Sequence, residues 1–173
     1  MMMDLMYYMD KGGVIMYILL ALNIIGFSTM IIKLIQYLLA KRKTSHIVSE
    51  VYDEFFVSDK EARLALGKDI LTEKMVQYER GLSTVRIIAS IAPLLGLLGT
   101  VIGVLSAFEA ISRLGLNDPS VFASGISLAL ITTVGGLVVA IPHYIGYNYL
   151  IGMLDKLEAK LNKEMSHTIY EEK

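Results

Sequence analysis

The sequence contains no cysteine among its 173 residues. It can therefore form neither a disulfide framework nor a thiolate metal site, and it carries no information on the redox compartment. The formal net charge is only -1, so the charge balance indicates neither nucleic acid nor an anionic surface as a partner. The sequence also lacks a metal-ligand cluster, a nucleophile–base pair and a phosphate-binding loop. We therefore expect that the protein is not an enzyme and uses no metal or cofactor.

Charge is missing from three long stretches, although 19% of all residues are charged. The uncharged runs are 14–32, 87–108 and 121–154, the last containing the neutral His143. About 20 apolar residues suffice for a helix to cross a bilayer. Because the runs are continuous and do not alternate in hydropathy, they predict helices and exclude the strands of a β-barrel. The sequence thus predicts an all-α membrane protein with three transmembrane helices.

Positive charge is distributed unevenly between the segments that connect these runs. Residues 41–86 hold nine Lys or Arg, the short segment 113–120 holds only Arg113, and the tail after Leu154 holds four Lys. Positively charged segments stay on the cytoplasmic side. We expect a periplasmic N-terminus and a cytoplasmic C-terminus. The first run is predicted to be an uncleaved span, because its positive charges follow it and do not precede it.

The predicted order of segments follows from these runs and charges. We expect an N-terminal periplasmic segment at 1–13, spans at 14–40, 87–112 and 121–150, a cytoplasmic helical loop at 41–86, a short periplasmic loop at 113–120, and a cytoplasmic C-terminal helix at 151–173.

The cytoplasmic segments are predicted to extend the spans as helices. In the loop we expect helices at about 44–56 and 59–85, the second opening with a capping box of Ser58 and Glu61. The apolar residues that recur at roughly helical spacing in that helix are Ala62, Leu66, Ile70 and Val76. In the tail, Leu154, Leu157 and Leu161 lie at i, i+3 and i+7, which indicates an amphipathic helix.

Small residues are frequent inside the second and third spans. Gly96, Gly99 and Gly103 fall on one face of the second span, and Gly135 and Gly136 lie in the third. Helices in lipid associate by close packing, which small residues permit. These glycines are predicted to form helix-packing grooves.

Two threonines, Thr100 and Thr133, lie near the middle of their spans. Polar residues in a membrane usually face protein or a cavity. A single threonine is weak evidence, because its hydroxyl can bond a carbonyl one turn back in its own helix. Two at similar depth favour a shared polar seam.

The stretch "APLLGLLGTVIGVLSAF" and the later "GISLALITTVGGLVVAIPHYIGYNYL" resemble the MotA/TolQ/ExbB proton-channel family. The ordered elements that carry the resemblance are Pro93, the run "GLLGTVIG", the run "TTVGGL" and the later "AIP…YN". Three spans with one long cytoplasmic loop look like the ExbB/TolQ branch and unlike the flagellar MotA branch. The form of the motif and the short length favour ExbB over TolQ.

The resemblance implies a homopentamer of helical subunits around a central pore in the bacterial inner membrane. The pore would hold the helices of a small single-span ExbD- or TolR-like partner with an intramembrane aspartate, and Thr100 and Thr133 match the family's two pore-facing threonines. Proton flow would move that partner and so power TonB-dependent outer-membrane transport. A TolQ-like role in envelope maintenance and a non-conducting membrane scaffold remain the alternatives.

Titratable groups are scarce in the predicted membrane interior. The family pattern often carries a glutamate five residues before the third-span threonine, and that position here is Leu128. Glu109 and Arg113, at i and i+4, form a candidate ion pair at the outer end of the second span. His143 is a candidate polar site toward the inner end of the third. A carboxylate for proton transfer is therefore expected to come from another chain.

Overall fold

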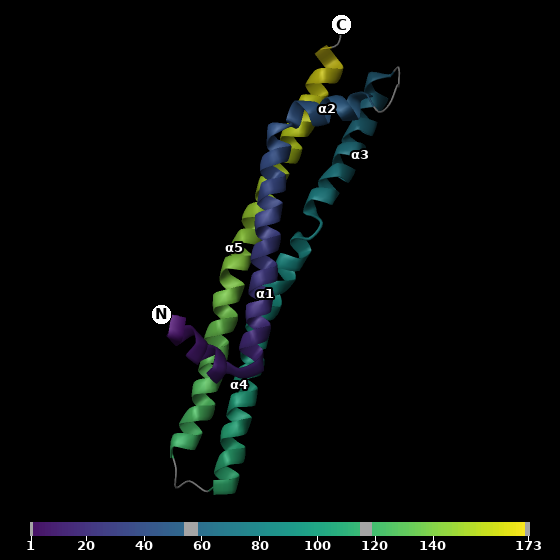
Figure 1. Cartoon of the computed structure of the whole chain (residues 1–173). Coiled ribbons are helices and arrows are strands. Elements are labelled where there is room, and N and C mark those ends of the chain that lie inside the picture. Colours follow the sequence, from purple (N-terminus) through teal and green to yellow (C-terminus); the bar gives the residue numbers. More distant parts are fainter. Residues whose placement is uncertain (1, 54–58, 115–118, 172–173) are drawn as a thin grey trace. The chain divides into compact units, whose positions relative to one another are not determined.

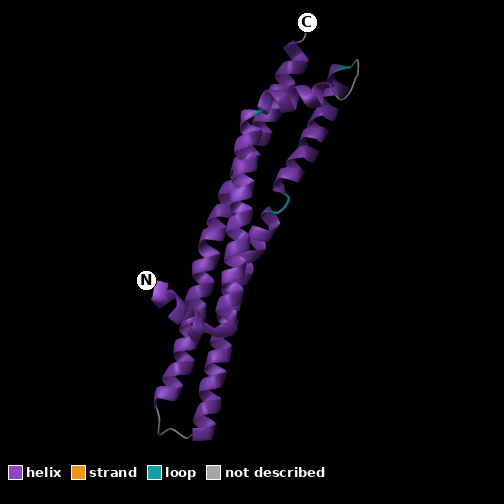
Figure 2. Ribbon diagram, in the orientation of Figure 1, coloured by secondary structure: helices purple, strands orange, loops and turns teal. Residues whose placement is uncertain are grey.

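The structure consists only of helices in the part of the chain that it describes. The computed structural model describes residues 2–53, 59–114 and 119–171. Its elements in chain order are α1 (Met2–Arg42), α2 (Thr44–Asp53), α3 (Lys60–Glu79), α4 (Leu82–Leu114) and α5 (Pro119–Glu171) (Figures 1 and 2). The all-α prediction is confirmed over these residues.

Three of the described helices are long and apolar enough to cross a membrane. The candidate spans are Met6–Arg42 with a mean hydropathy of 2.2, Leu82–Arg113 with 2.3, and Phe122–Glu171 with 2.0. Many of their large apolar side chains are exposed, as at Leu94 and Phe108. Exposed apolar surface on this scale needs lipid or another protein chain to cover it. The chain is a multi-pass membrane protein, as the three uncharged runs predicted.

Two glycines interrupt the helices by adopting positive φ angles. Gly13, with φ 60 and ψ -153, bends the chain inside α1. Gly81 has φ 91 and follows Arg80, whose backbone N–H donates to the Val76 carbonyl at 3.1 Å to end α3. Glycine adopts such angles without the steric cost that a Cβ imposes. The helix expected at 59–85 is therefore divided into α3 and the first residues of α4.

The start of α3 is capped by an aspartate. The Asp59 carboxylate accepts the Ala62 backbone N–H at 3.1 Å, and α3 begins at the next residue, Lys60. Ser58, the expected cap, lies outside the described residues. An aspartate caps a helix well because its short side chain reaches the free N–H groups of the first turn.

The buried face of α3 is formed by three residues one helical turn apart. Leu66 is 43% exposed and Val76 is 51% exposed, whereas Gly67, Leu71 and Met75 are buried. Ile70, one of the four apolar residues that recur at roughly helical spacing, is partly buried and packs against the buried residues. The buried stripe at i, i+4 and i+8 lies against α5, and a Cβ on Gly67 would lie only 3.3 Å from the Met165 sulfur.

The chain divides into two compact units, and α1, α4 and α5 contribute residues to both. The first unit comprises Met1–Ser28 and Thr84–Ile145. Its buried centre combines residues of all three helices: Leu19 from α1, Ile88 and Ala92 from α4, and Val139 and Ala140 from α5. Each helix of this unit thus packs one face against the other two, and the candidate site lies here.

The second unit comprises Thr29–Ser83 and Gly146–Lys173. The side chains of Leu154, Leu157 and Leu161 are 4%, 3% and 1% exposed, so the amphipathic tail is confirmed. Their stripe packs into a core drawn from α1, α2, α3 and α5, formed by Tyr37, Ala40, Ile47, Val48, Val51, Leu71, Met75, Leu82, Leu150, Leu154, Leu157, Leu161, Met165 and Ile169.

An exposed ion pair joins α2 to α3 within the second unit. Lys74 Nζ lies 2.9 Å from Glu50 Oε1. The hydrogen bond and the charge of Lys74 lower the pKa of the Glu50 carboxyl below its ordinary value. Because the pair faces water, we expect its contribution to stability to be small.

Candidate functional site

The threonine hydroxyls of α4 and α5 meet inside the first unit. Thr100 Oγ1 and Thr133 Oγ1 are 3.1 Å apart, and either can donate to the other. The hydroxyl that does not donate across the pair can donate within its own helix, from Thr100 to the Gly96 carbonyl at 3.3 Å or from Thr133 to the Ala129 carbonyl at 3.2 Å. Each hydroxyl has one hydrogen and two lone pairs, so a single bond between them leaves three of the four lone pairs free. Both side chains are only partly buried, and they can offer these lone pairs to water or to another chain.

The two hydroxyls meet because α4 and α5 approach backbone to backbone. A Cβ on Gly96 would lie 2.8 Å from the Thr132 carbonyl oxygen and 3.1 Å from Thr133 Cα. A Cβ on Gly136 would lie 2.5 Å from the Ala92 carbonyl oxygen. Only glycine fits at such distances. These contacts hold Thr100, one turn after Gly96, against Thr133.

The same close contact continues along α4. A Cβ on Gly103 would lie 2.6 Å from the Gly125 carbonyl oxygen and 2.9 Å from the Ala129 backbone nitrogen. Gly99 faces the side chain of Thr132, which is fully buried. The Thr132 hydroxyl is satisfied within its own helix, at 3.0 Å from the Ala129 carbonyl. Thr132 therefore fills space, whereas its neighbour Thr133 bonds across the helix pair.

Gly135 belongs to a different helix contact. A Cβ there would lie 2.6 Å from the Met16 sulfur of α1 and 3.5 Å from Leu19 Cδ1. The expected packing glycines thus divide between two contacts. Gly96, Gly99, Gly103 and Gly136 lie between α4 and α5, and Gly135 faces α1.

An apolar hollow opens beside Thr100. Its volume is about 410 Å³, and Val101, Val104, Leu105 and Phe108 of α4 line it together with Thr100. No acidic residue occurs in the sequence between positions 82 and 108 or between 119 and 154. The threonine pair is thus a polar group at the edge of an apolar surface, and none of the described residues that line the hollow is acidic.

His143 is not brought to the threonine pair. It lies ten residues after Thr133, which is about 15 Å along a helix. Its side chain is fully buried and its Nδ1 lies 2.7 Å from the Val139 carbonyl oxygen. Its partners are on α1, where the ring packs edge-on against Phe27 at 4.9 Å between centroids.

Glu109 and Arg113 are exposed on α4 and also lie away from the threonines. With Ser106 and Ala110 they line one shallow hollow of about 290 Å³. The structure therefore brings the two residues to one surface, and their pairing stays a prediction.

Sequence reasoning missed two residues of α1, Asn23 and Gly26. Asn23 Oδ1 is buried without a hydrogen-bond partner, and Gly26 lies directly against His143. A signal for Asn23 was present, because an amide in the middle of the uncharged run 14–32 is expected to face protein. Nothing local to the sequence indicated the partner of Gly26.

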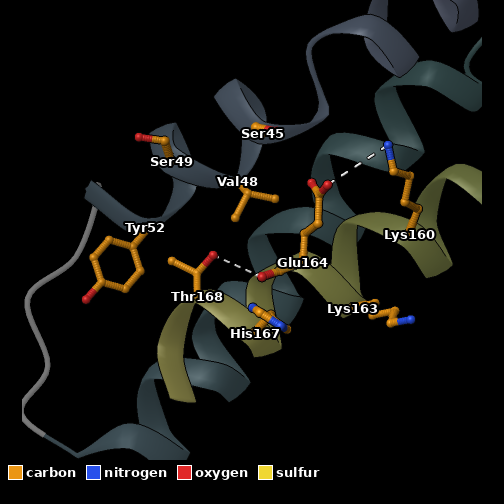
Figure 3. Close-up of a pocket in the computed structure, with 9 residues that line it drawn as sticks. All are labelled: Ser45, Val48, Ser49, Tyr52, Lys160, Lys163, Glu164, His167 and Thr168. Carbon is orange, nitrogen blue, oxygen red and sulfur yellow. Dashed lines mark hydrogen bonds and ion pairs between the residues drawn. The ribbon is translucent and has the colours of Figure 1, made fainter. Parts of the chain in front are cut away.

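A larger polar hollow lies in the second unit, between α2 and α5 (Figure 3). Its volume is about 640 Å³. The interactions drawn there stay within α5: Lys160 pairs with Glu164 at 4.0 Å, and Thr168 donates to the Glu164 carbonyl at 3.0 Å. Over the described residues no group of three or more His, Asp or Glu could hold a metal ion. Its ionisable side chains besides that of Tyr52 are those of Lys160, Lys163, Glu164 and His167, all on α5.

Comparison with known proteins points to one family. A model described as the MotA/TolQ/ExbB proton channel family matches residues 39–163. A protein of Methanothermobacter thermautotrophicus named a biopolymer transport protein ExbB homolog is 40% identical over 148 residues, which cover 85% of this chain and 46% of that protein.

Two bacterial relatives carry the ExbB name as well. The biopolymer transport protein exbB1 of Vibrio cholerae is 37% identical over 56% of this chain and 43% of its own length. The biopolymer transport protein ExbB of Aquifex aeolicus is 47% identical over 37% of this chain and 43% of its own length. The chain spans less than half the length of these relatives, and their names favour the ExbB branch.

Proposed function

The chain belongs to the MotA/TolQ/ExbB proton channel family, and on that premise we propose that it is an ExbB-like subunit of an energy-transducing complex driven by the proton-motive force. The observation that carries the proposal is the hydroxyl pair of Thr100 and Thr133, 3.1 Å apart and partly exposed in the middle of two membrane helices. A pair that served packing alone would be buried, as Thr132 is.

The proposed assembly is a homopentamer around a central pore in the bacterial inner membrane, surrounded by lipid, with the N-terminus periplasmic and the C-terminus cytoplasmic. The exposed apolar surface of α4, with Val101, Leu105 and Phe108 beside Thr100, supports it. Such surface must be covered by lipid or protein, and polar side chains in a membrane usually face protein or a cavity. We place Thr100 and Thr133 on the pore side.

Proton transfer in this proposal uses a carboxylate from a partner. An ExbD-like single-span protein would supply an intramembrane aspartate, because positions 82–108 of α4 and 119–154 of α5 contain no acid of their own. The threonine lone pairs would accept hydrogen bonds from water or from the protonated carboxyl group. They would thereby orient the donors along the path that the proton takes. The movement of the partner would then act on a TonB-like protein and power outer-membrane transport.

The double variant Thr100→Val and Thr133→Val tests this role. Valine keeps the shape of threonine and removes the hydroxyl, so each change should cost stability on the order of 1 kcal/mol. We expect the oligomer to stay assembled and partner-bound by native mass spectrometry, while partner-dependent proton flux into liposomes is lost. We also expect no flux from this chain alone.

The matched control is Thr132→Val, which removes the same hydroxyl one residue away. Because Thr132 bonds only carbonyls of its own helix, this variant should keep partner-dependent flux. Full flux in the double variant would contradict the role of the pair, and strong flux from the chain alone would contradict the need for a partner carboxylate. Assembly without flux under any condition would favour a non-conducting scaffold, whereas flux with a TolR-like partner only would favour a TolQ-like role in envelope maintenance.

A further inference from the structure

The outer face of α3 carries two carboxylates that form no ion pair within the described part of the chain, Asp69 and Glu73. Both residues are exposed. Asp69 lies two positions from the buried Gly67 and Leu71. Glu73 lies two positions from the buried Leu71 and Met75. Two positions turn a helix by about 200°, so both carboxylates lie on the side of α3 opposite its buried stripe.

Two exposed apolar side chains flank these carboxylates. Leu66 lies three positions before Asp69 and is 43% exposed. Val76 lies three positions after Glu73 and is 51% exposed. Positions three apart share a face of a helix, so the four residues form one surface, the acidic face of α3. Its apolar groups gain from being covered and its charges make lipid a poor cover, which together favour contact with a protein surface.

A basic stripe follows α5 on the other side of the same unit. It consists of four exposed residues at i, i+4, i+7 and i+11, which are Lys156, Lys160, Lys163 and His167. Lys163 lies two positions from Met165, against which Gly67 of α3 packs, so it is turned about 200° away from that contact. The stripe borders the hollow between α2 and α5, where three of its four side chains are seen (Figure 3).

Two contacts fix the relative heights of α3 and α5, which run antiparallel. Gly67 lies against Met165, where an added Cβ would be 3.3 Å from the sulfur. Thr72 donates to Glu158 Oε1 at 3.4 Å. Five positions forward in α3 thus correspond to seven positions back in α5. With a rise of about 1.5 Å per residue, the two contacts agree to within about 3 Å along the helices.

The acidic face and the basic stripe lie at the same height. Counting from these contacts places Asp69 level with Lys163. Glu73 falls level with the interval between Lys156 and Lys160. Equal height matters because the rotation that relates copies in a closed ring moves none of them along the axis. The axis of a ring in a membrane follows the membrane normal, and α5 continues as one helix from its membrane span. The acidic face of one copy can therefore meet the basic stripe of the next.

We propose that the second units of neighbouring copies bind head to tail, with Asp69 and Glu73 of one copy against the basic stripe of α5 in the next. The inference rests on the proposed homo-oligomer and adds which surfaces meet in it. Because the two surfaces lie on opposite sides of one unit, each copy uses one surface toward each neighbour, and the contact repeats until the ring closes. Exposed ion pairs add little affinity, but they set the orientation and register of the contact.

Crosslinking between single cysteines tests the contact, because the sequence has no native cysteine. Asp69→Cys and Lys163→Cys are placed in separate full-length chains, which are co-expressed in membranes and treated with a short bismaleimide reagent. We expect a covalent dimer from the mixture and none from either chain alone, since each surface meets only the other. The matched control pairs Lys68→Cys with Lys163→Cys. Lys68 is an exposed neighbour of Asp69 turned by about 100°, and it should give several-fold less dimer.

A charge reversal tests whether the ion pairs hold the contact in register. Glu73→Cys and Lys160→Cys, in separate chains, serve as the crosslinking reporter. Lys163→Glu places like charges opposite each other and should lower the yield of this crosslink by up to about fivefold. Adding Asp69→Lys restores opposite charges and should restore the yield. A yield that Lys163→Glu leaves unaltered, or that Asp69→Lys fails to restore, would overturn the pairing.

Native mass spectrometry of the same samples separates failure of this contact from failure of the proposed assembly. An intact homo-oligomer without the crosslink between positions 69 and 163 would overturn the head-to-tail contact and leave the assembly standing. A monomer would overturn both. A crosslink from Lys163→Cys to a different protein, without the covalent dimer, would show that the basic stripe serves another partner and would also overturn the proposal. The crosslinked dimer in a chain that supports no proton flux would bear out the contact and contradict only the channel role.

Discussion

Alanine in place of Gly103 should separate α4 from α5, whereas alanine in place of Gly135 should be tolerated. The two changes add the same methyl group to a membrane helix. At Gly103 the new Cβ would lie 2.6 Å from the Gly125 carbonyl oxygen and 2.9 Å from the Ala129 nitrogen. Both are backbone atoms, which cannot move without the whole helix. At Gly135 the nearest atoms are the Met16 sulfur and methyl carbon, at 2.6 and 3.2 Å.

The magnitudes follow from these neighbours. Glycine to alanine in a helix gains about 1 kcal/mol in backbone propensity. Overpacking a close contact costs about 1–3 kcal/mol, and rigid backbone neighbours at Gly103 place the cost at the upper end. We expect Gly103→Ala to lower the free energy of unfolding by about 2 kcal/mol. Methionine has three rotatable bonds and can turn its end away, so Gly135→Ala should be neutral or slightly stabilising.

Thermal unfolding of the purified chain in detergent, followed by circular dichroism, measures the difference. At about 2–4 °C per kcal/mol, the midpoint for Gly103→Ala should lie several degrees below that for Gly135→Ala. Equal midpoints for the two variants would refute the reasoning from backbone contact. A lower midpoint for Gly135→Ala would show that the Met16 side chain cannot adjust.

Two further predictions concern topology and pH. A cysteine placed in the segment 41–86 should be shielded from an impermeant thiol reagent in intact cells, whereas a cysteine at position 117 should be labelled. The sequence has no native cysteine, so no other residue reacts with the reagent. The reverse labelling pattern would overturn the orientation. Because Lys74 lowers the pKa of Glu50, their pair should stabilise the fold above the ordinary carboxyl pKa and lose that effect as pH falls through the lowered value. The difference in unfolding midpoint between the native chain and Lys74→Met should therefore be small at neutral pH and absent in acid; a difference that grows in acid would contradict the pairing.

Hydropathy alone determined the number and class of the membrane elements. The three uncharged runs became α1, α4 and α5, and the leucine stripe of 154, 157 and 161 became a buried face. These features are local, because a continuous apolar run must satisfy its own backbone in lipid and a stripe at helical spacing must be covered. The sequence also singled out Thr100 and Thr133 by their position in the runs, without showing that their hydroxyls lie 3.1 Å apart.

The choice of partner for each face was decided only by the tertiary structure. Gly135 and Gly136 are neighbours in sequence, yet one faces Met16 of α1 and the other faces Ala92 of α4. The buried stripe of α3 runs through Gly67, where Met165 of α5 packs, although the helical spacing of the apolar residues did not show which face would be covered. Gly26 meets His143 across 117 positions of the chain, and no local pattern encodes that pairing. Periodicity shows which residues share a helix face. Which helix covers that face depends on close packing between segments far apart in sequence, and one added methyl group can prevent that packing.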